Sequence, residues 1–155
     1  MSTQPGAETK RRTSRGASSV QRFFIGTSVL LYRLSGGAIG GRMGKAPLLL
    51  LTTTGRKSGK RYTTPVLYLV DGDRWVVVGS YAGAPMHPGW WLNLKANPRA
   101  EIEVGRQKVQ VTAAQASAEE RTRLWPLLTE MYPRYNDYQK KTSREMPVGI
   151  LTRVE

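Results

Sequence analysis

Two glycines and four basic side chains lie close together in the segment 52–65, which reads TTTGRKSGKRYTTP. Gly55 and Gly59 permit a tight turn with exposed backbone amides. Charged hydrogen-bond donors come from Arg56, Lys57, Lys60 and Arg61. Each well-placed ionic hydrogen bond is worth roughly 1.5–3 kcal/mol, so a few of them could hold an anionic ligand. From spacing alone, a solvated hairpin tip fits the segment equally well.

The segment is not a nucleoside-triphosphate loop. Such a loop has four residues between its glycines, then Gly-Lys and a Ser or Thr that holds magnesium. Here three residues separate Gly55 from Gly59, and Arg61 follows Lys60. The aliphatic run before the segment and the β-branched residues after it predict strands, so we expect no helix N-terminus to assist anion binding.

Three tyrosines in the stretch MYPRYNDY recur at every third residue: Tyr132, Tyr135 and Tyr138. This spacing would set them on one side of a short helix, where they could form a substrate wall or pack in the core. No Ser-His-Asp arrangement or carboxylate pair is evident. The chain has no cysteine and one histidine, His87, so we expect no metal site.

Positive charge is concentrated in the first half of the chain. The net charge is +13, and no acidic residue occurs between Glu8 and Asp71. The basic residues in that interval are Lys10, Arg11, Arg12, Arg15, Arg22, Arg33, Arg42, Lys45, Arg56, Lys57, Lys60 and Arg61. Such a field attracts nucleic acid, an anionic membrane or an acidic cofactor, unless it only keeps the protein soluble.

The 155 residues suffice for one domain preceded by a short tail. Residues 1–18 are small, polar or basic, and we expect them to be a disordered basic tail rather than a signal peptide. The domain would then cover residues 19–155. It starts with the largely apolar stretch VQRFFIGTSVLLYRL, which predicts an amphipathic helix lying on its own domain or on a membrane surface.

Short β-branched and aromatic runs with turn residues between them predict an antiparallel barrel with inserted helices. We expect strands at 47–54, 62–70, 74–80, 100–104 and 108–113, and a closing strand within 147–154. Turns are predicted at Asp71-Gly72 and Gly105-Arg106. One helix would lie in 87–98 with Pro88 as its first residue. A second would start at the Ser117–Glu120 capping box and be disturbed by Pro126.

Three blocks of sequence resemble a known family. They read LLTTTGRKSGKRYTTPVLYLVDGDRWVVVGSYAGA, HPGWWLNLKANPRAEIEV and WPLLTEMYPRYNDYQ, and they cover most of residues 47–140 in order. They resemble the deazaflavin-dependent nitroreductases of actinobacteria, mycobacteria included. These are split β-barrel oxidoreductases that use 8-hydroxy-5-deazaflavin (coenzyme F-420). The resemblance implies a mainly β or α+β fold: a single, antiparallel, flavin-reductase-like split barrel with flanking helices.

The resemblance also implies roles for individual residues. The phosphate and oligoglutamate tail of the coenzyme would bind at Thr54, Gly55, Arg56, Lys57, Ser58 and Arg61, although members often carry that arginine where this chain has Tyr62. The deazaflavin rings would face Thr64, Pro65, Val66, Ser80, Tyr81, Ala82 and Gly83. Trp90 and Asn93 match the family's W-x-x-N element at the cofactor groove. Substrate would meet Tyr132, Tyr135 and Tyr138, with proton delivery from Ser80 or Tyr135.

The expected activity is hydride transfer from the reduced deazaflavin to a quinone, an activated enone or a nitroaromatic. Such an enzyme would be cytoplasmic, with peripheral contact to an anionic membrane at its inner face as a further expectation. A deazaflavin-binding or storage protein without turnover is one alternative. A basic nucleic-acid binder is another, but we expect no nucleic acid because the aromatic residues are not interleaved with the basic strand. The oligomeric state stays open.

Overall fold

The computed structural model describes residues 15–154, with side chains described from residue 25 onward. Residues 1–14, the larger part of the predicted tail, lie outside the described residues. Helix α1 (Arg15–Ser35) starts inside the segment that the sequence assigned to the tail. The boundary between tail and helix therefore falls earlier than predicted.

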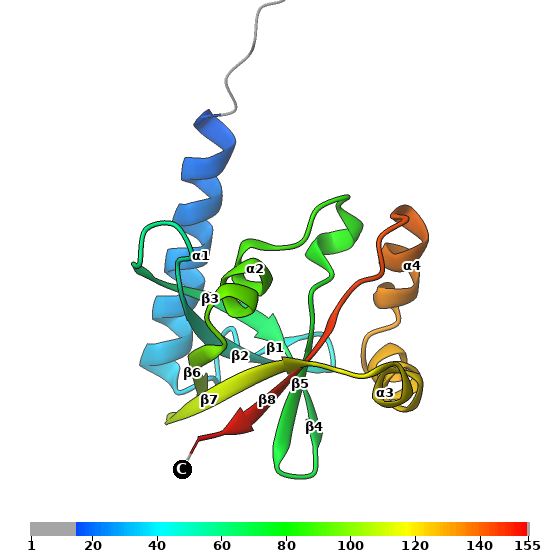
Figure 1. Ribbon diagram of the computed structural model, residues 1–155. Coiled ribbons are helices and arrows are strands. Elements are labelled where there is room, and N and C mark those ends of the chain that lie inside the picture. The colour runs from blue at the N-terminus through cyan, green and yellow to red at the C-terminus, as the bar shows by residue number, and fades with distance from the viewer. Residues whose placement is uncertain (1–14, 155) are drawn as a thin grey trace, which may run out of the picture.

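Eight strands form one antiparallel sheet that curves into a split barrel (Figure 1). They are β1 (Arg42–Met43), β2 (Ala46–Thr54), β3 (Arg61–Leu67), β4 (Leu69–Asp71), β5 (Arg74–Val78), β6 (Arg99–Val104), β7 (Gln107–Gln115) and β8 (Val148–Arg153). The strand order is β1-β2-β6-β7-β8-β5-β4, and β3 pairs with β2. Only Tyr68 separates β3 from β4, so one stretch of chain joins both ends of the sheet. The predicted fold class is confirmed.

The helix predicted within residues 87–98 and the helix predicted from Ser117 onward are both present, but each differs from the prediction at a proline. Pro88 is the N-cap of α2 (Gly89–Ala96) instead of its first residue, because its ψ of 150° is extended. Helix α3 (Ala118–Met131) has the predicted capping box of Ser117 and Glu120, but it continues through Pro126. A short 3-10 turn, η1 (Tyr81–Gly83), and helix α4 (Arg134–Lys141) complete the set.

Two apolar clusters fill the space on either side of the sheet. In the first, Trp91 of α2 packs with residues such as Leu51 and Leu151 from the strands. In the second, α3 and α4 cover β5 and β8, with Leu128 and Tyr135 among the buried side chains. Complete burial of one such side chain contributes about 1.5–3 kcal/mol, so these clusters hold the helices at fixed positions on the barrel.

Helix α1 packs on the barrel through Val29 and Tyr32, which contact Leu50 of β2. The Arg33 guanidinium donates to both carboxylate oxygens of Glu103, with Nη2 to Oε2 at 2.8 Å. The Glu103 side chain is only 7% exposed, so this ion pair compensates a buried charge. Helix α1 is therefore part of the domain.

The Asp71 carboxylate joins the β4–β5 hairpin to α3. It accepts from Arg123 at 2.8 Å and from Arg74 at 2.6 Å, and Arg74 also donates to Glu120. These donors, Arg123 first, hold the pKa of Asp71 well below its usual range. The stabilisation is thus complete above the ordinary aspartate pKa of about 4, and it is lost as the pH falls toward the lower, folded value.

Asp71→Asn should lower the free energy of unfolding at pH 7 by about 1–2 kcal/mol, because it removes the negative charge that accepts from two arginines in a partly exposed network. It should also flatten the loss of stability below about pH 4. Urea denaturation of both proteins between neutral and acidic pH measures this difference. Asp73→Asn, in the same turn, is the matched control, and coinciding curves for Asp71→Asn and the unchanged protein would contradict the prediction.

Candidate active site

A groove of about 1180 Å³ runs along β3. Its walls come from the loop between β2 and β3, the start of α2, the η1 turn, the tyrosines of α3 and α4, and the inner side of α1. Consecutive residues 62–67 of β3 all line it. Among the described strands β3 pairs only with β2, so its other edge lies open and residues from both of its faces reach the groove.

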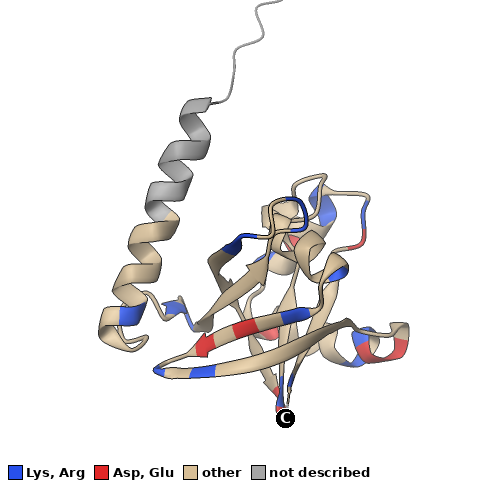
Figure 2. Ribbon diagram, turned by 60° about the vertical axis from the view of Figure 1, so that its left-hand side comes forward, with Lys and Arg blue, Asp and Glu red and all other residues tan. Residues whose placement is uncertain are grey.

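The basic loop closes one end of the groove. Its lining residues are Gly55, Arg56, Lys57, Ser58 and Lys60. The Gly55 amide donates to the Lys60 carbonyl at 2.7 Å, and a left-handed Gly59 (φ 70°) completes the turn. Figure 2 shows Lys and Arg on this loop and acidic residues on strand β6. The sequence named all of these lining residues as cofactor contacts except Lys60.

Asn93 fixes the basic loop to helix α2. Its Oδ1 accepts from the backbone amide and from Nη1 of Arg56, both at 3.1 Å. Its Nδ2 donates to Oγ1 of Thr53 at 3.1 Å, and the residue is only 6% exposed. Both ends of the amide are thus engaged by protein groups. The side chain lines the groove as predicted, and its contacts position Arg56.

The two adjacent tryptophans of α2 divide between site and core. Trp90, which the resemblance assigned to the cofactor groove, lines the groove of this structure. Trp91 is 3% exposed and belongs to the first core cluster. Their rings meet edge to face at 6.2 Å, so Trp91 holds Trp90 against the groove.

Three residues that the resemblance assigned to the cofactor lie outside the groove lining: Thr54, Arg61 and Gly83. Arg61 pairs with Glu101 of β6 at 3.8 Å, and its side chain is 63% exposed. Its neighbour Tyr62 lines the groove instead and places its hydroxyl 3.0 Å from Ser58 Oγ. Residues 62–67 all line the groove whereas Arg61 does not, so the shift of one position leaves the arginine outside the site. Thr54, Arg61 and Gly83 therefore do not line the groove, although the resemblance assigned them to the cofactor.

The segment after β5 contributes Ser80, Tyr81 and Ala82 to the groove wall. Tyr81 and Ala82 both have left-handed backbone conformations, with φ of 43° and 52°. Gly83 (φ 77°) packs against α4, where a Cβ would lie 2.7 Å from the Tyr138 carbonyl oxygen. Glycine is required there by the close approach of α4, which explains why Gly83 does not face the groove.

The three predicted tyrosines gather at the far end of the groove, but they do not share one helix. Tyr132 caps the C-terminus of α3, whereas Tyr135 and Tyr138 belong to α4. The hydroxyls of Tyr132 and Tyr138 lie 3.3 Å apart, and burial followed by this contact raises the pKa of Tyr132. Tyr135 is 2% exposed, and burial raises its pKa far above the ordinary value. Its phenol therefore stays protonated.

The apolar end of the groove was not predicted. It is lined by Ile25 and Gly26 of α1, by Met43 of β1 and by Leu48 and Leu67 of β2 and β3. The Tyr132 hydroxyl lies 3.5 Å from the Met43 sulfur, so α3 and β1 meet across it. Nothing in the local pattern marks these residues. The resemblance, in contrast, could have identified Tyr62, because members of the family often carry their arginine at that position.

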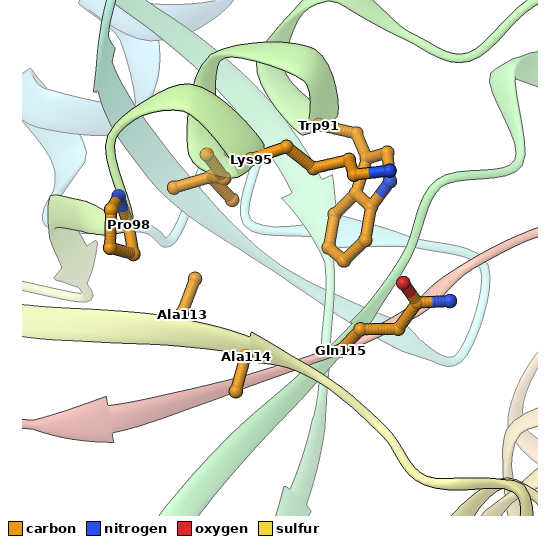
Figure 3. Close-up of a pocket in the computed structure, with 7 residues that line it drawn as sticks. Trp91, Lys95, Pro98, Ala113, Ala114 and Gln115 are labelled. Atoms are coloured by element: carbon orange, nitrogen blue, oxygen red, sulfur yellow. The ribbon is translucent and has the colours of Figure 1, made fainter.

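A second cavity of about 200 Å³ lies between α2 and the end of β7 (Figure 3). Trp91, Lys95 and Gln115 are among its lining residues. It contains none of the predicted site residues and is several times smaller than the groove. The groove has the dimensions and the donors that a tricyclic ring with an anionic tail requires, whereas this cavity does not.

A split barrel whose groove has a cationic loop at one end and a phenol-lined apolar wall at the other fits a reductase of the flavin or deazaflavin type. The family model described as F420H(2)-dependent quinone reductase matches residues 25–153. The chain belongs to this family. The predicted resemblance is confirmed, and with it the class of deazaflavin-dependent reductases.

Individual relatives agree with this assignment. An F420H(2)-dependent quinone reductase of Mycobacterium tuberculosis is 46% identical over 127 residues, which cover 79% of this chain and 85% of that protein. The solved structure of an F420-H2 dependent reductase (FDR-A) is 40% identical, covers 68% of this chain and 93% of its own, and has a TM-score of 0.63. HutZ of Vibrio cholerae, a heme storage protein, is 13% identical at a TM-score of 0.55 and shares the fold alone.

Proposed function

We propose that the chain reduces quinones with the reduced deazaflavin as hydride donor, and that one groove binds both molecules. The observation that carries this proposal is the continuity of the groove. A cavity of about 1180 Å³ joins the basic loop to an apolar wall that includes Tyr132 and Tyr138. Its size exceeds the roughly 300–1,000 Å³ of an ordinary small-molecule site, which fits a cofactor and a substrate together.

The basic loop is suited to the anionic part of the cofactor. Arg56, Lys57 and Lys60 supply charged donors, and Asn93 restrains Arg56 before binding, which lowers the entropic cost of binding. Thr64, Pro65 and Val66 on one side and Ser80, Tyr81 and Ala82 on the other would hold the flat rings. When bound, the reduced deazaflavin supplies a hydride.

The tyrosine end is suited to a quinone. Reduction adds one hydride and one proton, so the two carbonyl oxygens of the quinone become the hydroxyls of a quinol. Ser80 and the Tyr132–Tyr138 hydroxyl pair are among the groove groups that could donate a hydrogen bond to such an oxygen and deliver the proton. Tyr135, with its strongly raised pKa, is a poorer acid and serves better as an aromatic wall. Ile25, Met43 and Leu48 favour an apolar quinone over a small polar nitro compound.

Titration with the reduced deazaflavin followed by menadione tests the proposal. We expect binding, then recovery of absorbance at the oxidised band in proportion to the menadione added. Binding without recovery would favour a storage protein. If DNA bound with a steep salt dependence while the deazaflavin did not bind, the nucleic-acid alternative would replace the enzyme.

Peripheral contact with the inner face of an anionic membrane would bring the cytoplasmic enzyme to apolar quinones. The support is a set of exposed apolar side chains on α1 and in the segment that follows it: Leu30 (56% exposed), Leu34 (70%), Ile39 (56%) and Met43 (51%). Arg42 and Lys45 lie beside them in the sequence and could meet lipid phosphates. Among residues 15–154, no helix has the length and apolarity to cross a bilayer.

Liposome flotation tests the membrane contact without removing α1, whose Tyr32 is part of the core. The double variant Leu30→Ser, Leu34→Ser should reduce flotation with anionic vesicles several-fold, because each change removes apolar protein surface that would be buried in the lipid. Val70→Ser is the matched control, since Val70 is 60% exposed on β4. Equal flotation of the double variant and the unchanged protein would refute the contact.

A further inference from the structure

The side chain of Arg144 lies beneath the turn that carries Ser80 to the groove. Its guanidinium donates to three backbone carbonyls: Nε to Ala84 at 2.9 Å, Nη1 to Gly79 at 3.1 Å and Nη2 to Ser80 at 2.9 Å. Nη1 also lies 3.2 Å from Nδ1 of His87. Arginine has only donors, so this contact makes Nδ1 an acceptor and His87 a neutral imidazole. One side chain thus holds both ends of the segment 79–87.

The segment held in this way has an unfavourable backbone. Tyr81, Ala82 and Gly83 are left-handed in succession, with φ of 43°, 52° and 77°. A left-handed conformation is unfavourable for a residue other than glycine, because Cβ comes too close to the following carbonyl oxygen. Within the turn, the amides of Gly83 and Ala84 donate to the carbonyls of Ser80 and Tyr81. Hydrogen bonds from a charged donor are stronger than those between neutral groups, so the three from Arg144 can offset the cost.

The same residue is tied to the tyrosine helix. Gln139 of α4 donates from Nε2 to the Arg144 carbonyl at 2.7 Å and accepts the Met146 amide on Oε1 at 2.9 Å. On the other side of the turn, Gly83 packs directly against the backbone of Tyr138. The turn, Arg144 and α4 therefore form one packed unit, and both Ser80 and Tyr138 of this unit line the groove.

We infer that Arg144 is a positioning residue for the reduction: it fixes the spacing between the Ser80–Ala82 wall and the tyrosines of α4, between which acceptor and rings must meet. The inference rests on the proposed function of the groove. Arg144 does not line the groove, so it acts through the backbone it holds. Loss of that hold should misplace the reacting groups while the basic loop, at the other end of the groove, still binds the anionic tail.

Arg144→Ala tests the inference, with Arg74→Ala as the matched control. Arg74 is also a partly buried arginine, with its side chain 29% exposed, but its partners are Asp71 and Glu120, away from the groove. In Arg144→Ala, we expect kcat for menadione to fall about 10- to 100-fold, as for other losses of orientation. The Kd for the reduced deazaflavin should rise by a smaller factor than kcat falls, since the basic-loop contacts to the anionic tail remain. In Arg74→Ala, thermal stability falls while kcat is retained.

Two readouts are independent of turnover and use the protein without cofactor. Amide hydrogen exchange at Gly83 and Ala84 should accelerate at least about tenfold in Arg144→Ala and not in Arg74→Ala. Burial, Arg144 and Lys95 lower the pKa of His87, so its NMR titration should move up toward 6.5 when Arg144 is removed. His87 is the single histidine of the chain, which makes its signal unambiguous.

Added guanidinium ion separates positioning from general stability. At millimolar concentration it should restore part of kcat in Arg144→Ala and none in Arg74→Ala, because only the former has a vacated site for the ion. Unchanged exchange at Gly83 and Ala84, or a fall in kcat that is equal in both variants, would overturn the inference. If the unchanged protein bound the deazaflavin without reducing menadione, the proposed function would fail, while the exchange and His87 results would still decide whether Arg144 holds the turn.

Discussion

Replacing Lys57 by glutamate is expected to weaken the binding of the reduced deazaflavin by about 10- to 100-fold. Lys57 lines the basic end of the groove, so the change removes a charged donor and adds a repulsive carboxylate. A lost ionic hydrogen bond costs roughly 1.5–3 kcal/mol, and each 1.4 kcal/mol corresponds to about a factor of ten in Kd. Titration of the cofactor at fixed ionic strength measures the effect.

Arg61→Glu is the matched control, because it makes the same change of charge in the same hairpin. Arg61 pairs with Glu101 and does not line the groove, so its replacement should alter the Kd less than about threefold. An equal loss in both variants would mean that the net field of the hairpin attracts the cofactor without a defined contact. Unchanged affinity in Lys57→Glu would remove Lys57 from the site.

Asn93→Ala should lower both stability and cofactor affinity. The change removes two acceptor contacts to Arg56 and one donor contact to Thr53, all at a residue only 6% exposed. We expect the free energy of unfolding to fall by about 2–3 kcal/mol, because buried partners lose their hydrogen bonds. Affinity should fall about tenfold, since the loop must then be ordered on binding. Urea denaturation and cofactor titration measure the two effects.

Asn97→Ala is the control, because it removes another asparagine side chain of the same helix that has no contact with the basic loop. Asn97 caps α2 and accepts the Arg99 amide at 3.2 Å, but it is exposed and lies away from the loop. It should cost less than about 1 kcal/mol and leave the cofactor affinity unchanged. If Asn93→Ala kept its stability and still lost affinity, Asn93 would contact the cofactor directly and its positioning role would be wrong.

Local patterns predicted the elements of the barrel well. Turn residues such as Gly72 and Gly105, both left-handed in the structure, separate strands whose composition is strongly β-branched. The basic loop was found for the same reason, since its glycines and cations are contiguous in sequence. The pairing of the strands was harder to predict. The second predicted strand divides at Tyr68, because the residues before Tyr68 pair with β2 and those after it pair with β5. No local sequence pattern indicates this division.

The parts of the site that sequence missed come from long-range contacts. Arg61 matched the family's arginine approximately, but its contact with Glu101 depends on the register of β2, β3 and β6. Arg144 follows α4 in an unremarkable polar stretch, and only the fold brings it under the segment after β5. The three-residue spacing of the tyrosines could not show that Tyr135 is buried, because burial depends on the α3–α4 packing.

The position of β8 in the middle of the sheet has a consequence for how the protein is made. This strand, residues 148–153, pairs with β5 on one side and with β7 on the other. During synthesis the earlier strands can form hairpins such as β6–β7, but β5 and β7 each keep an open edge until residue 153 has left the ribosome. Open edges invite pairing with other chains, so we expect the nascent chain to need chaperones during this interval. Because α4 and the Ser80 turn are positioned against this part of the sheet, the groove can capture its cofactor only after synthesis has passed β8.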